Sequence, residues 1–243
     1  MSLAASGVTH QGRRSTNEDA WLVDLDLGLL IVADGMGGHN AGEVASAIAV
    51  DVIREFLLDN AGTRTRAGLE HAVNLANERI LSAAARRSDH AGMGTTVVAA
   101  LVVDGHTYYT SVGDSRVYLW QSGVLAQLTR DDSWLADALG EGDVGEEQAQ
   151  SIGSHPMRHV LTKVVGLRPE LQAKASECTL GAGDCLLLCS DGVHGSVPHD
   201  VLAEMMRAPG SVAEIAQRVV GSAISRGATD NATAVVARLA GSS

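Results

Sequence analysis

The sequence predicts an α+β fold, in which helices and mostly antiparallel strands occupy separate stretches of the chain. Strand-like and helical segments come in blocks and do not alternate, which is the pattern of layered α+β domains. The middle of the chain holds consecutive apolar and β-branched runs at Thr95–Val103, Tyr108–Val112 and Arg116–Trp120. The dipeptides Asp104–Gly105 and Ser122–Gly123 suit hairpin turns. We therefore expect an antiparallel meander in this block.

The first part of the chain predicts two strands followed by two long helices. We expect the strands near Ala20–Leu25 and Gly28–Ala33. The first helix is predicted to open at Asn40, because Asn40 and Glu43 have the form of a capping box and apolar residues recur after them at helical spacing. A second helix with its own apolar stripe is expected across about Thr65–Arg87.

The rest of the chain predicts a polar, helical segment and then a mixed block. Residues 131–168 have a helical, polar pattern with glycine interruptions, and regular structure should be weak at Glu141–Gly142–Asp143, so we interpret the segment as a lid or flap. After it we expect a strand, a second strand, two helices and a closing strand, at Gln172–Thr179, Cys185–Cys189, Pro198–Arg207, Ser211–Arg226 and Asn231–Leu239.

The composition indicates a single large domain, residues 1–243. Hydrophobic residues make up 45% of the chain, which is enough to bury a sizeable core. The net charge of −11 argues against nucleic-acid or anionic-membrane partners, which need clustered Lys and Arg. The chain has no signal-peptide pattern and no long apolar run, so we expect a cytoplasmic protein that does not enter the membrane. Its three cysteines lack CxxC spacing, which disfavours zinc and a disulfide framework.

Short turns that contain aspartate stand beside apolar, strand-like runs at several places. They are Asp34–Gly35, Gly113–Asp114, Asp191–Gly192 and Asp230–Asn231. An aspartate in such a place is most often a turn former, because it caps its own backbone and glycine accepts positive φ. However, burying several unpartnered carboxylates is costly unless a cation meets them. Together they predict one metal cluster, and their hard oxygen ligands suit Mg²⁺ or Mn²⁺.

The same turns belong to a series of motifs whose order resembles a known family. The motifs are Gly12–Ala20, Val32–His39, Gly94–Thr96, Val112–Arg116, Leu188–Gly192 and Thr229–Asn231. In this order they resemble the PP2C (PPM) family of metal-dependent serine/threonine protein phosphatases, in its compact bacterial stand-alone form. The resemblance covers about Val8 to Leu239. It implies a four-layer α-β-β-α sandwich, with a binuclear metal site at one end of two central sheets.

The resemblance also implies roles for particular residues. Asp34 would bridge two divalent ions, the carbonyl of Gly35 would bind one of them, and Asp191 and Asp230 would bind the other. Asp114 would help to hold a third ion, although it could also belong to a simple tight connection. Glu18 would orient water from behind the ligands.

Arg14 is the expected phosphate handle of the site. A guanidinium can form two parallel hydrogen bonds to a phosphoryl group and offset its charge. Its neighbour Arg13 could compete for the role, but counting four residues back from Glu18 in the family pattern selects Arg14.

The chain departs from the family pattern in two places. Some members have a histidine directly after Asp-Gly, where it acts as general acid, but this chain has Met36 there. His39 is the candidate for that role, and a packing or capping role for it is the alternative. In the expected flap, Asp132 stands where related sequences have a histidine after aspartate.

The expected function is a protein serine/threonine phosphatase that hydrolyses phosphoserine and phosphothreonine in one in-line step with a metal-activated water. Its partners would be phosphorylated proteins, including a bacterial serine/threonine kinase and its substrates, and a monomer is the default. Two alternatives remain open: a non-catalytic phosphatase-like regulator that binds phosphoproteins, and a two-metal hydrolase of nucleotides or phosphodiesters. The acidic balance and an aromatic content of only 3% argue against the last.

Overall fold

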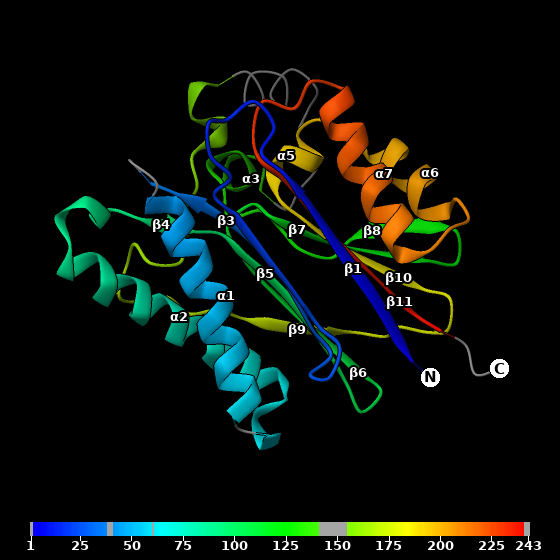
Figure 1. Cartoon of the computed structure of the whole chain (residues 1–243), viewed down its shortest axis with the longest axis horizontal. Coiled ribbons are helices and arrows are strands. Elements are labelled where there is room, and N and C mark those ends of the chain that lie inside the picture. The colour runs from blue at the N-terminus through cyan, green and yellow to red at the C-terminus, as the bar shows by residue number, and fades with distance from the viewer. Residues whose placement is uncertain (1, 38–40, 60, 141–154, 241–243) are drawn as a thin grey trace.

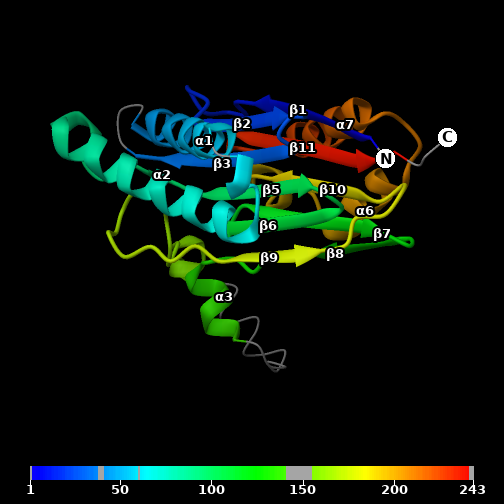
Figure 2. The same ribbon diagram turned by 90° about the horizontal axis from the view of Figure 1, so that it is seen from below.

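The structure is a computed structural model that describes residues 2–37, 41–59, 61–140 and 155–240. Two antiparallel sheets face each other at its centre. The first has the order β1 (Leu3–His10), β11 (Ala232–Leu239), β10 (Cys185–Cys189), β7 (Arg116–Gln121) and β8 (Val124–Gln127). The second has the order β2 (Asp19–Asp24), β3 (Leu29–Met36), β5 (Val97–Val103), β6 (His106–Val112) and β9 (Ala175–Cys178), and the short β4 (Gly94–Thr95) pairs with β3. Figure 2 shows that the two sheets extend in the same direction, from β1 and β2 at one edge to β8 and β9 at the other.

Helices cover the outer faces of both sheets. The second sheet carries α1 (Ala41–Asp59) and α2 (Arg66–Arg86). The first sheet carries α5 (Asp191–His194), α6 (His199–Arg207) and α7 (Val212–Ser225). The arrangement is a four-layer α-β-β-α sandwich (Figure 1), as the motifs predicted.

The apolar core therefore has three layers, one between the sheets and one beneath the helices on each outer face. In β3, Leu29 and Ile31 face α1 and α2, whereas Leu30 and Val32 face the other sheet. Both faces of the strand are buried, which is why its sequence is a continuous apolar run and does not alternate. The same division holds for Leu187 in β10 and its neighbours.

Two of the predicted helices, α2 and α7, begin next to the first residue of their predicted segments. The side chain of Thr65 accepts a hydrogen bond from Gly68 N at the start of α2. Ser211 and Glu214 form a complete capping box at the start of α7. Asn40, the predicted cap of α1, lies outside the described residues.

The predicted meander is wrong in one respect. β5 and β6 form a hairpin, with positive φ at Asp104 and Gly105, but β6 and β7 belong to different sheets. The chain crosses from one sheet to the other at Gly113, whose φ of 100° is readily available only to glycine. The sequence also left β1 and β8 unpredicted. Finally, β3 does not end before Asp34 but runs through it to Met36, because Gly35 pairs with Thr95 of β4.

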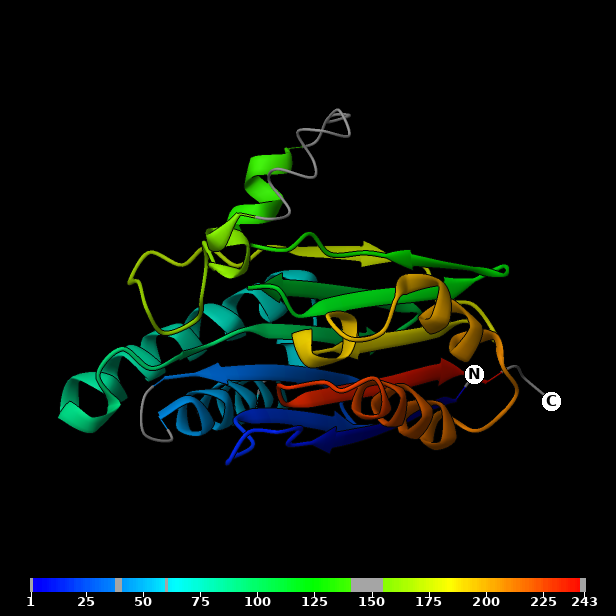
Figure 3. The ribbon, with the colours of Figure 1, turned by 90° about the horizontal axis from the view of Figure 1, so that it is seen from above.

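The expected flap contains two short described elements, α3 (Trp134–Leu139) and the 3₁₀ helix η3 (Pro156–His159). α3 points away from the two sheets (Figure 3). The middle of the expected flap, residues 141–154, lies outside the described residues. None of the helices in the described ranges has the length and apolar character needed to cross a membrane.

Candidate active site

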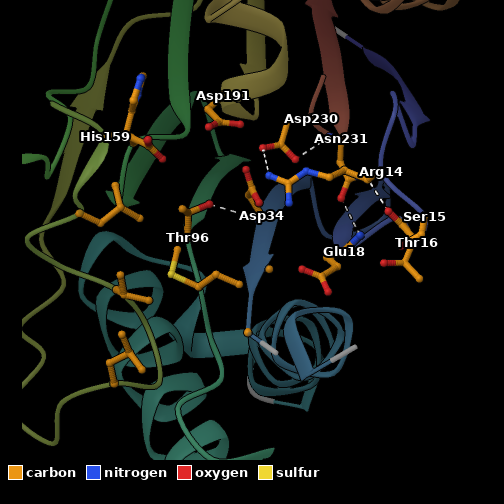
Figure 4. A pocket seen from close by; sticks show the side chains of 17 residues that line it. Arg14, Ser15, Thr16, Glu18, Asp34, Thr96, His159, Asp191, Asp230 and Asn231 are labelled. Atoms are coloured by element: carbon orange, nitrogen blue, oxygen red, sulfur yellow. Dashed lines mark hydrogen bonds and ion pairs between the residues drawn. The ribbon is translucent and has the colours of Figure 1, made fainter. Parts of the chain in front are cut away.

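A cavity of about 650 Å³ opens at one end of the two sheets. Four segments reach this end of the sheets: the end of β3, the β6–β7 turn, the end of β10 and the start of β11. The cavity is lined by every predicted ligand and phosphate-binding residue that the structure describes: Arg14, Glu18, Asp34, Gly35, Asp114, Asp191 and Asp230 (Figure 4). Residues far apart in the chain are thus brought to one place, as predicted.

Asp34 lies at the centre of the cluster, near the end of β3. Its backbone N–H donates to Thr96 Oγ1 (3.0 Å), and its carbonyl accepts from Thr96 N (2.8 Å). The backbone is thereby held on both sides of the carboxylate. Burial raises the pKa of Asp34 well above its usual range, and the negative charges of Asp19 and Asp191 raise it further.

Asp191 is the first residue of the short helix α5 and is separated from the buried strand β10 only by Ser190. Burial raises the pKa of its carboxyl group, as does the charge of Asp230. The side chain of Asp34 acts in the opposite direction. Both carboxyl groups line the same cavity, so they are candidate ligands of one cation.

Asp114 lies in the turn that joins the two sheets. Burial, followed by the charge of Asp191, raises its pKa to about 7. The turn is held in place by His194, whose Nε2 lies 2.9 Å from the carbonyl oxygen of Asp114. Burial lowers the pKa of His194 to about 4, so this ring is neutral at pH 7 and donates from Nε2.

Asp230 pairs with Arg14 across the mouth of the cavity. Arg14 Nη2 lies 2.6 Å from Asp230 Oδ2, and this hydrogen bond raises the pKa of the guanidinium. The Arg14 side chain is 60% exposed, so a ligand that enters the cavity can reach it. Arg13 does not line the cavity, which supports the choice of Arg14 over its neighbour.

Glu18 and Gly35 lie against the start of α1. The carbonyl of Glu18 accepts hydrogen bonds from Gly35 N (3.1 Å) and Ser46 Oγ (2.6 Å). A Cβ on Gly35 would lie 2.1 Å from the carbonyl oxygen of Gly42 and 2.6 Å from that of Glu18, so only glycine fits there. Burial raises the pKa of Glu18.

The cluster fits a divalent cation in its chemistry. All its donors are oxygens, and Asp191 Oδ1 is a buried atom without a hydrogen-bond partner among the described residues. Across those residues, however, no group of three or more His, Cys, Asp or Glu side chains is already arranged around a common point as metal ligands. The pairing of Asp230 with Arg14 explains part of this, because it holds one predicted ligand toward the guanidinium.

A sequence profile of the family described as protein phosphatase 2C matches residues 6–223. The chain belongs to the protein phosphatase 2C family.

Named members of the family are similar over most of the chain. The serine/threonine protein phosphatase PstP of Mycobacterium tuberculosis (strain H37Rv) is 37% identical over 227 residues, which cover 92% of this chain and 42% of PstP. The serine/threonine phosphatase stp of Listeria monocytogenes serovar 1/2a is 34% identical over 212 residues, 86% of this chain and 83% of stp. The chain therefore spans less than half the length of PstP but matches most of stp.

The crystal structure of the catalytic domain of PstP in complex with two manganese ions has the same fold. It aligns with a TM-score of 0.87 at 33% identity, covering 98% of this chain and 99% of that chain. This protein phosphatase 2C fold agrees with the α+β sandwich that the motifs predicted.

Two residues at the site were not predicted as functional. Asp19 stands opposite Asp34 in the β2–β3 pair, and its Oδ2 accepts from Ser190 Oγ (2.8 Å) and Thr233 Oγ1 (2.6 Å). Asn231 donates to the carbonyls of Gln11 and Thr16 and accepts from Glu18 N, which ties the β1–β2 loop to β11. Both residues directly follow predicted site residues, and that adjacency was the signal available in the sequence.

The histidines are divided between the site and its surroundings. His39, the candidate general acid, lies outside the described residues. His159 lines the cavity, on the side away from Arg14 (Figure 4). His155 caps η3 through its Nδ1 and stacks on Trp134, which agrees with a structural role in the expected flap.

Proposed function

We propose that this chain is a metal-dependent protein serine/threonine phosphatase whose residues 1–243 form one phosphatase domain with a flap at about 131–168. The observation that carries the proposal is the meeting of Asp34, Asp114, Asp191, Asp230 and Arg14 in one cavity. Membership of the protein phosphatase 2C family supports it. The pairing of β1 with β11 joins the two ends of the described chain in one sheet, in agreement with a single domain.

The residues that would hold two or three divalent cations, Mn²⁺ or Mg²⁺, are Asp34, the carbonyl of Gly35, Asp114, Asp191 and Asp230. Two manganese ions are bound in the PstP relative. Such cations, when bound, supply Lewis-acid activation of water and of the phosphoryl oxygens. The raised pKa values of Asp34 and Asp114 indicate how strongly the cluster favours a positive charge among its members.

Arg14 would bind the substrate phosphate. Its exposed guanidinium lies at the cavity mouth, and its present partner is a carboxylate, which a phosphate can replace because both anions accept paired N–H donors. Entry of substrate would then free Asp230 from Arg14. Glu18, held by Asn231 and α1, would orient water beside the ligands.

His39 remains the proposed general acid for the leaving alkoxide. Met36 lines the cavity at the position directly after Asp34–Gly35, where some family members have a histidine. This role is tested by measuring kcat of His39→Ala with a phenyl phosphate and with an alkyl phosphate. The loss of kcat should be smaller for the phenyl phosphate, because a phenolate leaving group needs less protonation than an alkoxide.

The partners we propose are phosphorylated proteins of the same cell, among them a serine/threonine kinase and its substrates. We further propose a monomer that works in the cytoplasm. The acidic net charge of −11 agrees with the lack of a nucleic-acid or anionic-membrane partner.

The proposal is tested by measuring phosphate release from a phosphothreonine peptide with Mn²⁺, Mg²⁺ or EDTA. We expect turnover with Mn²⁺ or Mg²⁺ that EDTA removes and that Asp34→Asn and Asp191→Asn reduce by more than about a thousandfold. If folded wild type binds the peptide but never releases phosphate, the protein is the non-catalytic phosphoprotein-binding regulator instead.

A further inference from the structure

The cavity is lined by two kinds of side chain. Besides the carboxylates and Arg14, its lining includes Leu161, Val164 and Leu167, which we call the apolar wall. A phosphoryl group and its ligands use the polar side chains. A phosphate needs no apolar contact, so the apolar wall is available to another part of the substrate.

The apolar wall is held rigidly by residues outside the site. The buried side chain of Asn77 accepts from Gly166 N (2.7 Å) through Oδ1 and donates to the carbonyl of Arg168 (2.9 Å) through Nδ2. These two bonds fix the backbone on both sides of Leu167. Two further bonds, both 2.9 Å, join Val165 to Thr95 of β4.

Glycine at position 166 allows the backbone turn that positions Val164 and Leu167. Its φ is 97°, and a Cβ there would lie 2.2 Å from Ile80 Cγ2, so the turn packs directly on α2. Val164 and Leu167 both lie against Gly94, within 2.7 and 3.2 Å of a Cβ built there, which places their side chains side by side. Leu167 is therefore displayed by a fixed turn and not by a free loop.

Leu167 is nonetheless 43% exposed. Large exposed apolar side chains are few in the described part of the chain, and Met157, Val160 and Leu167 all belong to the C-terminal part of the expected flap. Apolar side chains that are held in place beside a polar cavity are typical of ligand-binding sites. The feature is continuous with the cavity itself, since Leu161 and Val164 line it too.

We propose that the apolar wall is a subsite for an apolar side chain of the substrate, within about three residues of the phosphoserine or phosphothreonine. The inference rests on the proposed phosphatase function and adds a sequence preference to it. The favoured substrate is a phosphorylated segment with a leucine-like residue beside the phosphoresidue. The carboxylates that line the same cavity disfavour an acidic substrate residue in this subsite, because like charges repel each other.

The test compares phosphothreonine peptides that are identical except for leucine, serine or glutamate at each position from three before to three after the phosphoresidue. p-Nitrophenyl phosphate, which has no flanking residues, is assayed in parallel with Mn²⁺. We expect one position at which leucine raises kcat/KM about fivefold to tenfold over serine, mainly through a lower KM. Leu167→Ser should reduce this leucine preference to less than about twofold.

Two variants control the test. Leu167→Met keeps an apolar side chain and should retain the preference, whereas Leu58→Ser removes a leucine of similar exposure, 45%, from the far end of α1 and should also retain it. Melting curves of all variants establish that each is folded. Leu161→Ser provides a second change in the wall if Leu167→Ser proves unstable.

The outcomes separate the inference from the function on which it rests. Turnover of p-nitrophenyl phosphate and of all peptides without any leucine preference overturns the subsite and leaves the phosphatase standing. If the leucine preference survives in folded Leu167→Ser and Leu161→Ser, another part of the protein causes it, and the proposal that the apolar wall is the subsite is refuted. Absence of Mn²⁺-dependent turnover with both kinds of substrate overturns the phosphatase and the subsite together.

Discussion

Arg14 and Asp230 are joined by a hydrogen bond of 2.6 Å between Nη2 and Oδ2, although they lie 216 residues apart in the chain. The expected phosphate handle is thus paired with an expected metal ligand. The hydrogen bond raises the pKa of the Arg14 guanidinium. In the proposed phosphatase, the pair would link substrate binding to the carboxylate cluster.

Replacing Arg14 by alanine should weaken phosphate binding. We expect KM for a phosphothreonine peptide to rise and kcat/KM to fall by about 10- to 100-fold, because a charge-assisted hydrogen bond is lost. Arg14→Lys should recover only part of the loss, since lysine cannot form two parallel bonds. Arg13→Ala is the matched control and should stay within about twofold of wild type. Equal losses in Arg13→Ala and Arg14→Ala would refute the assignment.

Asp34→Asn should change stability in opposite directions with and without metal. In the metal-free protein the amide avoids the burial of a charge and the repulsion by neighbouring carboxylates, which together raise the pKa of Asp34. The melting temperature should therefore rise by about 2–4 °C, on the order of 1 kcal/mol. With Mn²⁺ the wild type should gain stability and the variant should gain little, because a ligand is missing. Differential scanning fluorimetry with EDTA and with Mn²⁺ measures both. An unchanged Mn²⁺ shift in the variant would contradict the role of Asp34.

The stability of the metal-free protein should depend on pH through Asp114. Its pKa is about 7 in the folded state against an ordinary value of 3.8, so the folded state keeps its proton to higher pH than the unfolded chain. The contribution of Asp114 to stability is therefore greatest below pH 4 and is lost as pH rises to about 7. Relative to wild type, Asp114→Asn should become progressively more stable across this range. Melting curves in EDTA test this, and a difference that is flat with pH would contradict it.

Gly35→Ala should be strongly destabilising. The new Cβ would lie 2.1 Å from the carbonyl oxygen of Gly42, so β3 and α1 would have to separate beside the site. We expect a loss of about 2–4 kcal/mol in unfolding free energy, measured by urea denaturation. Gly221→Ala is the control, because nothing lies within 4 Å of its Cβ and it sits inside α7. That change should stabilise by about 0.5–1 kcal/mol.

The sequence predicted the candidate site better than the path of the chain around it. The predicted ligands stand at or next to strand ends, and pairing within each sheet together with the packing of the two sheets brings those ends together. The strand β1 was missed because most of its residues are small or polar and none of them is fully buried. The crossing at Gly113 was missed because a glycine-aspartate turn looks alike in a hairpin and in a crossover between sheets.

By itself, the sequence determined which residues could carry the chemistry, since the aspartates, Arg14 and their order are local features. It also determined where two helices begin, because the predicted segments open at Thr65 and Ser211, which cap α2 and α7 in the structure. Only the tertiary structure decided that Arg14 donates a hydrogen bond to Asp230. It also decided that Asn77 binds the backbone of Gly166, 89 residues away, and so fixes the neighbouring Leu167 in the apolar wall. The reason is physical. Propensity and capping act between neighbours in the chain, whereas ion pairs and exposed subsites are created by packing between distant segments.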